Sequence, residues 1–174
     1  FWKPYPNVND YIKLALAVSK TIRSTAPKEI FIGPAVASFD WYFLEECFKA
    51  GLLNYFDGVS LHGYRQSNPE TTLTDWAKLR NLIDRYAKPG RKVQMVSGEW
   101  GYSELYNGLN LDLQSKYITR QYLTNLMSGV NLSIWYDWKD DGPDPTEPEH
   151  HFGSVYANLE PKPTYTNVFK LSGQ

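Results

Sequence analysis

Glu99 places a carboxylate where a hydrophobic strand would end, in the stretch MVSGEWGYS at residues 95–103. Apolar residues precede it, Gly98 would let the backbone approach a ligand closely, and Trp100 would limit the access of water. A charged group loses hydration in such a place, and that loss is costly unless the site uses the charge. The carboxylate could act as a nucleophile or a general base, or it could accept structural hydrogen bonds from a neighbouring strand.

His62 and Tyr64 belong to the segment LHGY, which ends an earlier apolar stretch. The ends of neighbouring strands in a β/α barrel come within side-chain reach of one another. Either residue could therefore bind a sugar hydroxyl or orient Glu99. The alternative is a histidine and a tyrosine that simply pack in the core.

Two tryptophans flank the end of the last apolar stretch, in IWYDW at residues 134–138. The C–H face of a sugar ring stacks well on an indole. We expect Trp138 or Trp135 to form the floor of a sugar subsite, with the other facing the helices, because side chains alternate between the two faces of a strand. The alternative is that both tryptophans pack in the core. Trp100 and Tyr102, just after Glu99, are further candidates for contact with a sugar.

A long polar loop follows at residues 139–151 and carries many charges. Its EPEHH segment, residues 147–151, matches no familiar spacing of metal ligands. Its DDG segment, residues 140–142, lacks the ligand positions that would continue an EF-hand. We therefore expect a solvated acidic loop, and we predict neither a metal nor a cofactor.

The composition is that of a globular protein with an unusual aromatic content. The 174 residues are 42% hydrophobic, enough for one domain with a core, and the net charge is −1. This charge gives no reason to expect nucleic acid or a membrane surface as a partner. Aromatic residues make up 16%, and such rings can present flat platforms to sugars. The single cysteine, Cys47, is expected to be a packed thiol.

Apolar residues at helical and strand spacing alternate along the chain. The helices are predicted to be capped by Asn9 or Asp10 in the first and Asp40 in the second, and to cover about 10–26, 40–51, 72–87, 112–129 and 164–171. The apolar side of the fourth helix is expected to comprise Tyr122, Leu123, Leu126, Met127 and Val130. The strands are predicted at 29–38, 57–64, 92–100 and 132–138.

Strands that alternate with helices predict an α/β fold of parallel βα units. Each strand is apolar without clean alternation, as expected when both of its faces are covered. The polar residues His62, Glu99 and Asp137 all fall at carboxyl ends of strands. That edge carries the active site in β/α barrels, and a similar rule holds for doubly wound sheets, so position alone leaves both folds open. No glycine-rich phosphate-binding motif follows any strand.

Three strand ends together resemble the clan A glycoside hydrolases, which are retaining enzymes on a (β/α)8 barrel. MVSGEWGYS resembles the nucleophile segment at strand seven, which implies that Glu99 is the nucleophile. VSLHGY resembles strand six, which implies that His62 and Tyr64 line the subsite of the reacting sugar. SIWYDWKDDG and the later HFGSVYANLEPKPTYTNV resemble strand eight and the last helix, with a spacing typical of families 5 and 39.

The acid/base glutamate of the clan lies in an Asn-Glu-Pro-like motif at strand four, and this sequence has no such motif. FWKPYPNVNDY at the start resembles the segment that follows it. The resemblance thus implies a single domain over residues 1–174, the C-terminal half of a TIM (β/α)8 barrel, from the loop after strand four through helix eight. Glu104, Glu70 and Asp137 could approach Glu99, but nothing in the sequence nominates one as the acid.

The expected function is part of a retaining hydrolase of β-linked glucan- or xylan-type saccharides. A half barrel exposes strand edges, which invite association. We therefore expect a partner, either the N-terminal half barrel or a second copy of this chain. The alternatives are an inactive half barrel that self-associates and at most binds carbohydrate, and an unrelated doubly wound binding protein. No nucleic-acid or membrane partner is expected, and a full-length parent would fit a secreted or periplasmic location.

Overall fold

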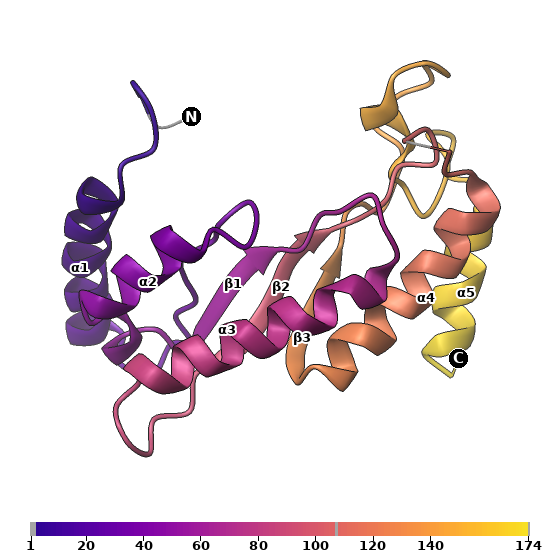
Figure 1. The fold of residues 1–174 in the computed structure, drawn as a ribbon. Helices are drawn as coiled ribbons and strands as arrows, with labels where there is room; N and C mark the ends of the chain where they lie inside the picture. Colours follow the sequence, from indigo (N-terminus) through magenta and orange to yellow (C-terminus); the bar gives the residue numbers. More distant parts are fainter. Residues whose placement is uncertain (1–2, 107, 174) are drawn as a thin grey trace.

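The computed structural model describes residues 3–106 and 108–173. Helices and strands alternate along the chain (Figure 1). The α-helices are α1 (Val8–Thr25), α2 (Trp41–Lys49), α3 (Leu73–Tyr86), α4 (Leu111–Met127) and α5 (Pro163–Leu171). The strands are β1 (Gly58–His62), β2 (Gln94–Trp100) and β3 (Val130–Trp135). Short 3-10 helices are η1 (Leu52–Asn54), η2 (Pro69–Thr72) and η3 (Pro148–His151).

The three strands form a parallel sheet in the order β1-β2-β3, which confirms the predicted α/β fold of βα units. The predicted strand at 29–38 needs correcting, because this segment joins β1 only through isolated bridges at Ile32 and Val36. Gly33-Pro34 lies between the two bridges. Proline has no N–H to donate to a ladder, so a regular strand cannot run through it.

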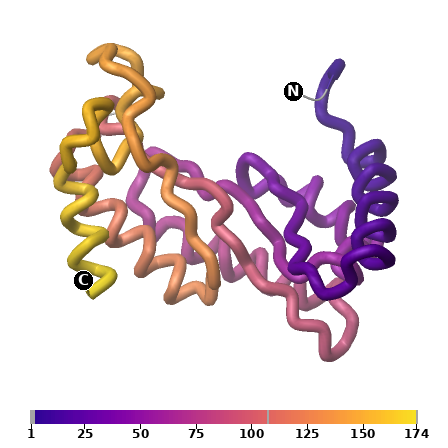
Figure 2. The backbone as a smooth tube through the Cα atoms, turned by 180° about the vertical axis from the view of Figure 1, so that it is seen from behind, coloured from indigo at the N-terminus to yellow at the C-terminus, as the bar shows by residue number. Residues whose placement is uncertain are grey.

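The helices lie on one side of the sheet (Figure 1). Seen from behind, the strands of the described chain carry no helix in front of them (Figure 2). Exposed apolar side chains, Leu132 and Ile134 on β3, agree with an open face. A doubly wound sheet has helices on both faces, whereas a barrel has them only outside. The one-sided arrangement is that of a partial (β/α)8 barrel.

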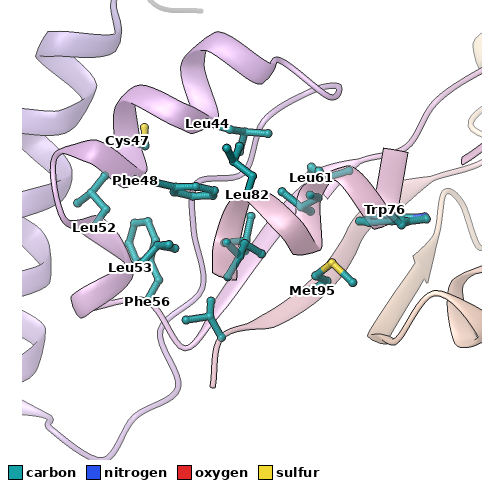
Figure 3. Packing of buried hydrophobic residues seen from close by; sticks show 14 of the residues in the cluster. Leu44, Cys47, Phe48, Leu52, Leu53, Phe56, Leu61, Trp76, Leu82 and Met95 are labelled. Atoms are coloured by element: carbon teal, nitrogen blue, oxygen red, sulfur yellow. The ribbon is translucent and has the colours of Figure 1, made fainter. Parts of the chain in front are cut away.

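A hydrophobic cluster holds the first half of the chain together (Figure 3). It joins α2 and η1 to β1, α3 and β2 through side chains that are almost fully buried, among them Leu44, Phe48, Leu61, Trp76 and Met95. Cys47 is buried in the same cluster, as expected for a packed thiol. The cluster supports the strands whose ends carry His62 and Glu99.

Helix starts follow the predicted chemistry with one correction. The Asp40 side chain accepts a hydrogen bond from the Phe43 N–H at 3.0 Å and caps α2, as predicted. The cap of α1 is Asn7, not Asn9 or Asp10, and Asp10 lies in the first turn, where it supplies the N–H that Asn7 binds. A carboxylate in the first turn still favours the helix through its dipole.

Most of the predicted apolar face of α4 is not buried: of its residues Tyr122 packs against a hydrophobic cluster, and Val130 is buried but belongs to β3. Leu126 and Met127 are 72% and 77% exposed, whereas Gln114 and Gln121 are fully buried. The buried amides donate to backbone carbonyls around the end of β2: Gln121 to Trp100 O, in the last residue of the strand, at 3.0 Å, and Gln114 to Tyr102 O, just beyond it, at 2.7 Å. Irregular backbone leaves carbonyls that must be paired, so a polar helix face fits this position better than an apolar one.

Candidate active site

Glu99 lies near the carboxyl end of β2, opposite His62 of β1 in the register of the sheet. Its side chain is 37% exposed. The Tyr64 O–H donates a hydrogen bond to Glu99 Oε1 at 2.8 Å. His62 Nδ1 is 3.7 Å from Glu99 Oε2, which is too long for a hydrogen bond. The structure therefore brings the three predicted residues together, with Tyr64 as the direct partner of the carboxylate.

Tyr64 is held as a neutral hydrogen-bond donor. Burial, and then the hydrogen bond and charge of Glu99, raise the pKa of Tyr64 far above its usual value. A phenol that keeps its proton can stabilise the Glu99 carboxylate and fix its orientation. Hydrogen bonds to charged groups contribute about 1.5–3 kcal/mol each.

Two glycines near Glu99 allow neighbouring segments of the chain to pack closely. A Cβ on Gly98 would come within 2.3 Å of Ser60 Oγ on β1, so this glycine is required by the neighbouring strand. The expectation that Gly98 serves a ligand is corrected accordingly. A Cβ on Gly101 would likewise overlap the carbonyl oxygen of Tyr136. Close packing of β2 against β1 thus depends on Gly98, and close packing of the segments after β2 and β3 depends on Gly101.

A cleft of about 920 Å³ opens at the carboxyl ends of the strands and contains Glu99. This volume lies within the range of small-ligand sites. The predicted residues His62, Tyr64 and Tyr102 also line it. The lining residues that were not predicted from the sequence include Tyr106, Tyr136, Glu149 and Phe152.

The tryptophans lie outside this cleft. Trp100 and Trp135 are 0% and 9% exposed and pack with Tyr102 and Tyr117 beneath α4. The expected stacking of Trp100 or Trp135 on a sugar is corrected, because both side chains are buried in the protein. Trp138 is 61% exposed, lines a separate cavity of about 540 Å³, and packs edge-on against Tyr165.

Tyr136 takes the place that Trp135 was expected to fill. It lines the cleft and packs against Phe152, with ring centroids 5.4 Å apart. The alternation of side chains along a strand contained this signal, because a buried Trp135 directs its neighbour to the other side. Aromatic side chains from tyrosine and phenylalanine, and no tryptophan, therefore form the walls of the cleft around Glu99 among the described residues.

The carboxylates considered as partners for Glu99 are engaged elsewhere. Glu70 makes two hydrogen bonds of 2.7 Å to Arg120. Glu104 contacts His151 and Lys162. Asp137 borders the other cavity, and burial, then the charges of Asp141 and Asp140, raise its pKa to about 6. None of the three lines the Glu99 cleft.

A buried charge cluster anchors the loop after β3. Lys162 is fully buried, and its Nζ lies 2.7 Å from Asp140 Oδ1 and 3.7 Å from Glu104 Oε2. The same Asp140 oxygen accepts the Gly153 N–H at 2.9 Å, and His151 Nδ1 is 3.0 Å from Glu104 Oε1. Asp140 was expected to be solvated loop charge. The structure corrects this, because an inward-pointing lysine from the PKP segment supplies the opposite charge.

The described residues hold no group of three or more His, Cys, Asp or Glu side chains that could bind a metal ion. In the same part of the chain, no helix has the length and apolar character needed to cross a bilayer.

No family model matches the chain, and no curated protein matches it. Solved structures of glycoside hydrolases match its fold. A family 39 glycoside hydrolase from Bacteroides cellulosilyticus WH2 aligns over 89% of this chain and 35% of its own, with a TM-score of 0.79 and 24% identity. A family 39 β-xylosidase from Caulobacter crescentus aligns over 94% and 37%, with a TM-score of 0.69 and 21% identity.

A family 17 β-1,3-glucanosyltransferase from Rhizomucor miehei aligns over 94% of this chain and 59% of its own, with a TM-score of 0.61 and 14% identity. The chain thus spans about a third of the two family 39 structures and more of the third one. At these identities the likeness establishes a shared fold. The chain has the fold of part of a glycoside hydrolase barrel.

Proposed function

We propose that this chain is the C-terminal half of a clan A-type retaining glycoside hydrolase, with Glu99 as its nucleophile. The observation that carries the proposal is the Glu99 carboxylate at the carboxyl end of β2, in a cleft and hydrogen-bonded by Tyr64. Carboxyl ends of strands carry the catalytic groups of barrel enzymes. The likeness to glycoside hydrolase structures supports this interpretation.

In this mechanism a Glu99 oxygen attacks the anomeric carbon of a β-linked glucan- or xylan-type substrate. The bond from that carbon to the leaving-group oxygen breaks, and an acid protonates that oxygen. Water then hydrolyses the glycosyl ester and restores the Glu99 carboxylate. Tyr64 orients the nucleophile throughout, and His62 lies where it can bind a hydroxyl of the same sugar.

The acid/base group is proposed to come from outside this chain. Retaining enzymes keep their two carboxyl groups about 5–5.5 Å apart. Glu70, Glu104 and Asp137 do not line the cleft, and Glu149, which does, lies in the loop after β3 and not at the strand-four end where the resemblance places the acid. Among the described residues, strand β3 pairs with β2 alone, and Leu132 and Ile134 along it are about half exposed. The missing N-terminal half barrel, carrying the acid, is the partner that would cover this edge.

A trapping experiment tests Glu99. A 2-deoxy-2-fluoro-glycoside with a dinitrophenolate leaving group needs no acid for the first step, so the chain can be labelled without its partner. Mass spectrometry of peptides should find the sugar on Glu99 and no label in Glu99→Gln. Glu160→Gln, which alters an exposed carboxylate away from the cleft, should label normally. A label on another residue would contradict the proposed nucleophile.

An inactive, self-associating half barrel is the second candidate, and the open edge of β3 is the observation that favours it. Two copies could cover each other's exposed strands. Light scattering distinguishes the candidates: a stable dimer of 174-residue chains that takes up no label supports this one. A monomer that labels at Glu99 contradicts it.

A further inference from the structure

A second carboxylate faces the Glu99 cleft from the loop after β3. Glu149 lies in η3 and lines the same cleft, with its side chain open to solvent. The Tyr106 O–H donates a hydrogen bond to Glu149 Oε1 at 3.1 Å. Burial, then the charges of Asp141 and Asp137, and after these the charges of Glu149 and Glu99, raise the pKa of Tyr136. Glu149 and Glu99 thus border one space from two different strand ends.

Hydrogen bonds of neighbouring residues hold the loop that carries Glu149 in place. His151 contacts Glu104 at 3.0 Å, and its other ring nitrogen lies 2.8 Å from Asp144 O. The Glu147 side chain accepts the Glu149 N–H at 3.3 Å. Binding groups held by such supporting contacts are better preorganised than groups on a free loop. The carboxylate of Glu149 is therefore presented to the cleft in a defined position while one of its oxygens remains free of protein donors in the described chain.

The charges that line the cleft are unbalanced. Glu99 and Glu149 contribute two carboxylates, and Arg65 is the lining residue with a permanent positive charge in the described part of the chain. The guanidinium of Arg65 is already engaged, because both terminal nitrogens lie 3.2 Å from Asp75 Oδ2 and Nε donates to Gly63 O. A ligand with a carboxylate would meet two like charges here and no free cation, and like charges in contact oppose binding.

We propose that Glu149 is a substrate-binding residue that accepts hydrogen bonds from the hydroxyls of a neutral sugar unit, and that its charge excludes uronic acids. This inference rests on the proposed function of the cleft and adds the class of saccharide that it takes. A carboxylate accepts hydrogen bonds from hydroxyls and donates none. Glu149 with Glu99 therefore selects a neutral, hydroxyl-rich ring and disfavours a sugar acid.

Isothermal titration of the 174-residue chain with three probes tests the inference: cellotetraose, xylotetraose and tetragalacturonate. A neutral probe should bind the unaltered chain more tightly than tetragalacturonate does. Glu149→Gln should weaken the neutral probe roughly ten-fold, because an amide oxygen accepts a weaker hydrogen bond than a carboxylate. Glu149→Lys should weaken the neutral probe and strengthen tetragalacturonate. The matched control Glu160→Gln should change neither affinity.

The inference would be overturned if tetragalacturonate bound as tightly as the neutral probes. It would also be overturned if Glu149→Gln and the unaltered chain bound a neutral probe with equal affinity. The absence of binding by every probe would overturn it as well. Labelling of Glu99 by the fluoroglycoside is a separate readout. A Glu149→Gln chain that labels at Glu99 with unchanged affinity rejects the role of Glu149 and leaves the nucleophile in place.

Discussion

Replacing Lys162 by methionine should destabilise the fold strongly, although the residue lies outside the Glu99 cleft. Lys162 is fully buried and is the positive partner of Asp140, which is 4% exposed, and of Glu104. Methionine keeps most of the volume of the lysine stem, so the change removes the charge and leaves little cavity. Asp140 would then be a buried carboxylate with the Gly153 N–H as its remaining donor.

The size of the effect follows from the cost of an unpaired buried charge. Removing one member of a buried ion pair costs about 3–5 kcal/mol. The ammonium also lies 5.1 Å from the centroid of the Tyr156 ring, and such a contact adds about 0.5–1 kcal/mol. Domains are stable by about 5–15 kcal/mol in total. The variant should therefore lose about 3 kcal/mol or more of its free energy of unfolding, a large part of the whole.

Urea unfolding followed by circular dichroism measures this loss. Lys170→Met, an exposed lysine on α5, is the matched control and should change stability by about 0.5 kcal/mol or less. Adding Asp140→Asn to Lys162→Met should recover part of the loss, because asparagine removes the unpaired charge and still accepts the Gly153 N–H. A loss below about 1 kcal/mol in Lys162→Met would refute the view that this cluster anchors the loop.

Three further predictions concern the strand ends. Tyr64→Phe should lower kcat/KM of the assembled enzyme by about ten-fold or more through loss of the 2.8 Å hydrogen bond to Glu99, and should lower urea stability by no more than the roughly 1.5–3 kcal/mol of that bond; equal rates would contradict it. Gly98→Ala should cost about 1–3 kcal/mol, and Ser60→Ala should restore much of it by removing the clashing oxygen, as urea unfolding of single and double variants would show. Asp137 has a pKa of about 6 against an ordinary 3.8, so the folded state binds more protons and stability falls as pH rises from about 4 to 6. Asp137→Asn should remove that fall, with a gain of at most about 2 kcal/mol above pH 6 once solvent screening is allowed for; unfolding curves of equal pH slope would count against it.

The positions of Glu99, His62 and Tyr64 could be predicted because they depend on local pattern. An apolar run followed by a carboxylate marks a strand end, and parallel strands bring their ends to the same edge. Two of the four strands predicted from the sequence, 57–64 and 92–100, contain β1 and β2 of the structure. Alternation along β3 shows that Tyr136 faces the cleft only once Trp135 is known to be buried, and that burial depends on tertiary contacts with Tyr102 and Tyr117.

The charged loop shows why other residues were missed. Glu149 and Asp140 both lie in a polar segment, and only tertiary contacts separate a buried, paired carboxylate from one at a cleft wall. Lys162, which decides the matter for Asp140, is 22 residues further along. The amide face of α4 was missed for a similar reason, since its partners are carbonyls of Trp100 at the end of β2 and of Tyr102 just after it. Periodicity of apolar residues carries no information about such partners.

The distribution of groups over the chain gives the proposed reaction a kinetic signature. Glu99, Tyr64 and Glu149 are all present on this chain and are positioned by contacts within it. Under the proposal the chain lacks only a proton donor for the leaving group. A dinitrophenolate needs no proton to depart, whereas an alkoxide does. The chain alone should therefore form the glycosyl ester from a dinitrophenyl glycoside at a measurable rate and leave an alkyl glycoside uncleaved.

The addition of the N-terminal half should accelerate cleavage of the alkyl glycoside far more than cleavage of the dinitrophenyl glycoside. Equal acceleration of both would place the defect of the isolated chain in sugar binding or in the nucleophile, because only a missing acid distinguishes the two leaving groups.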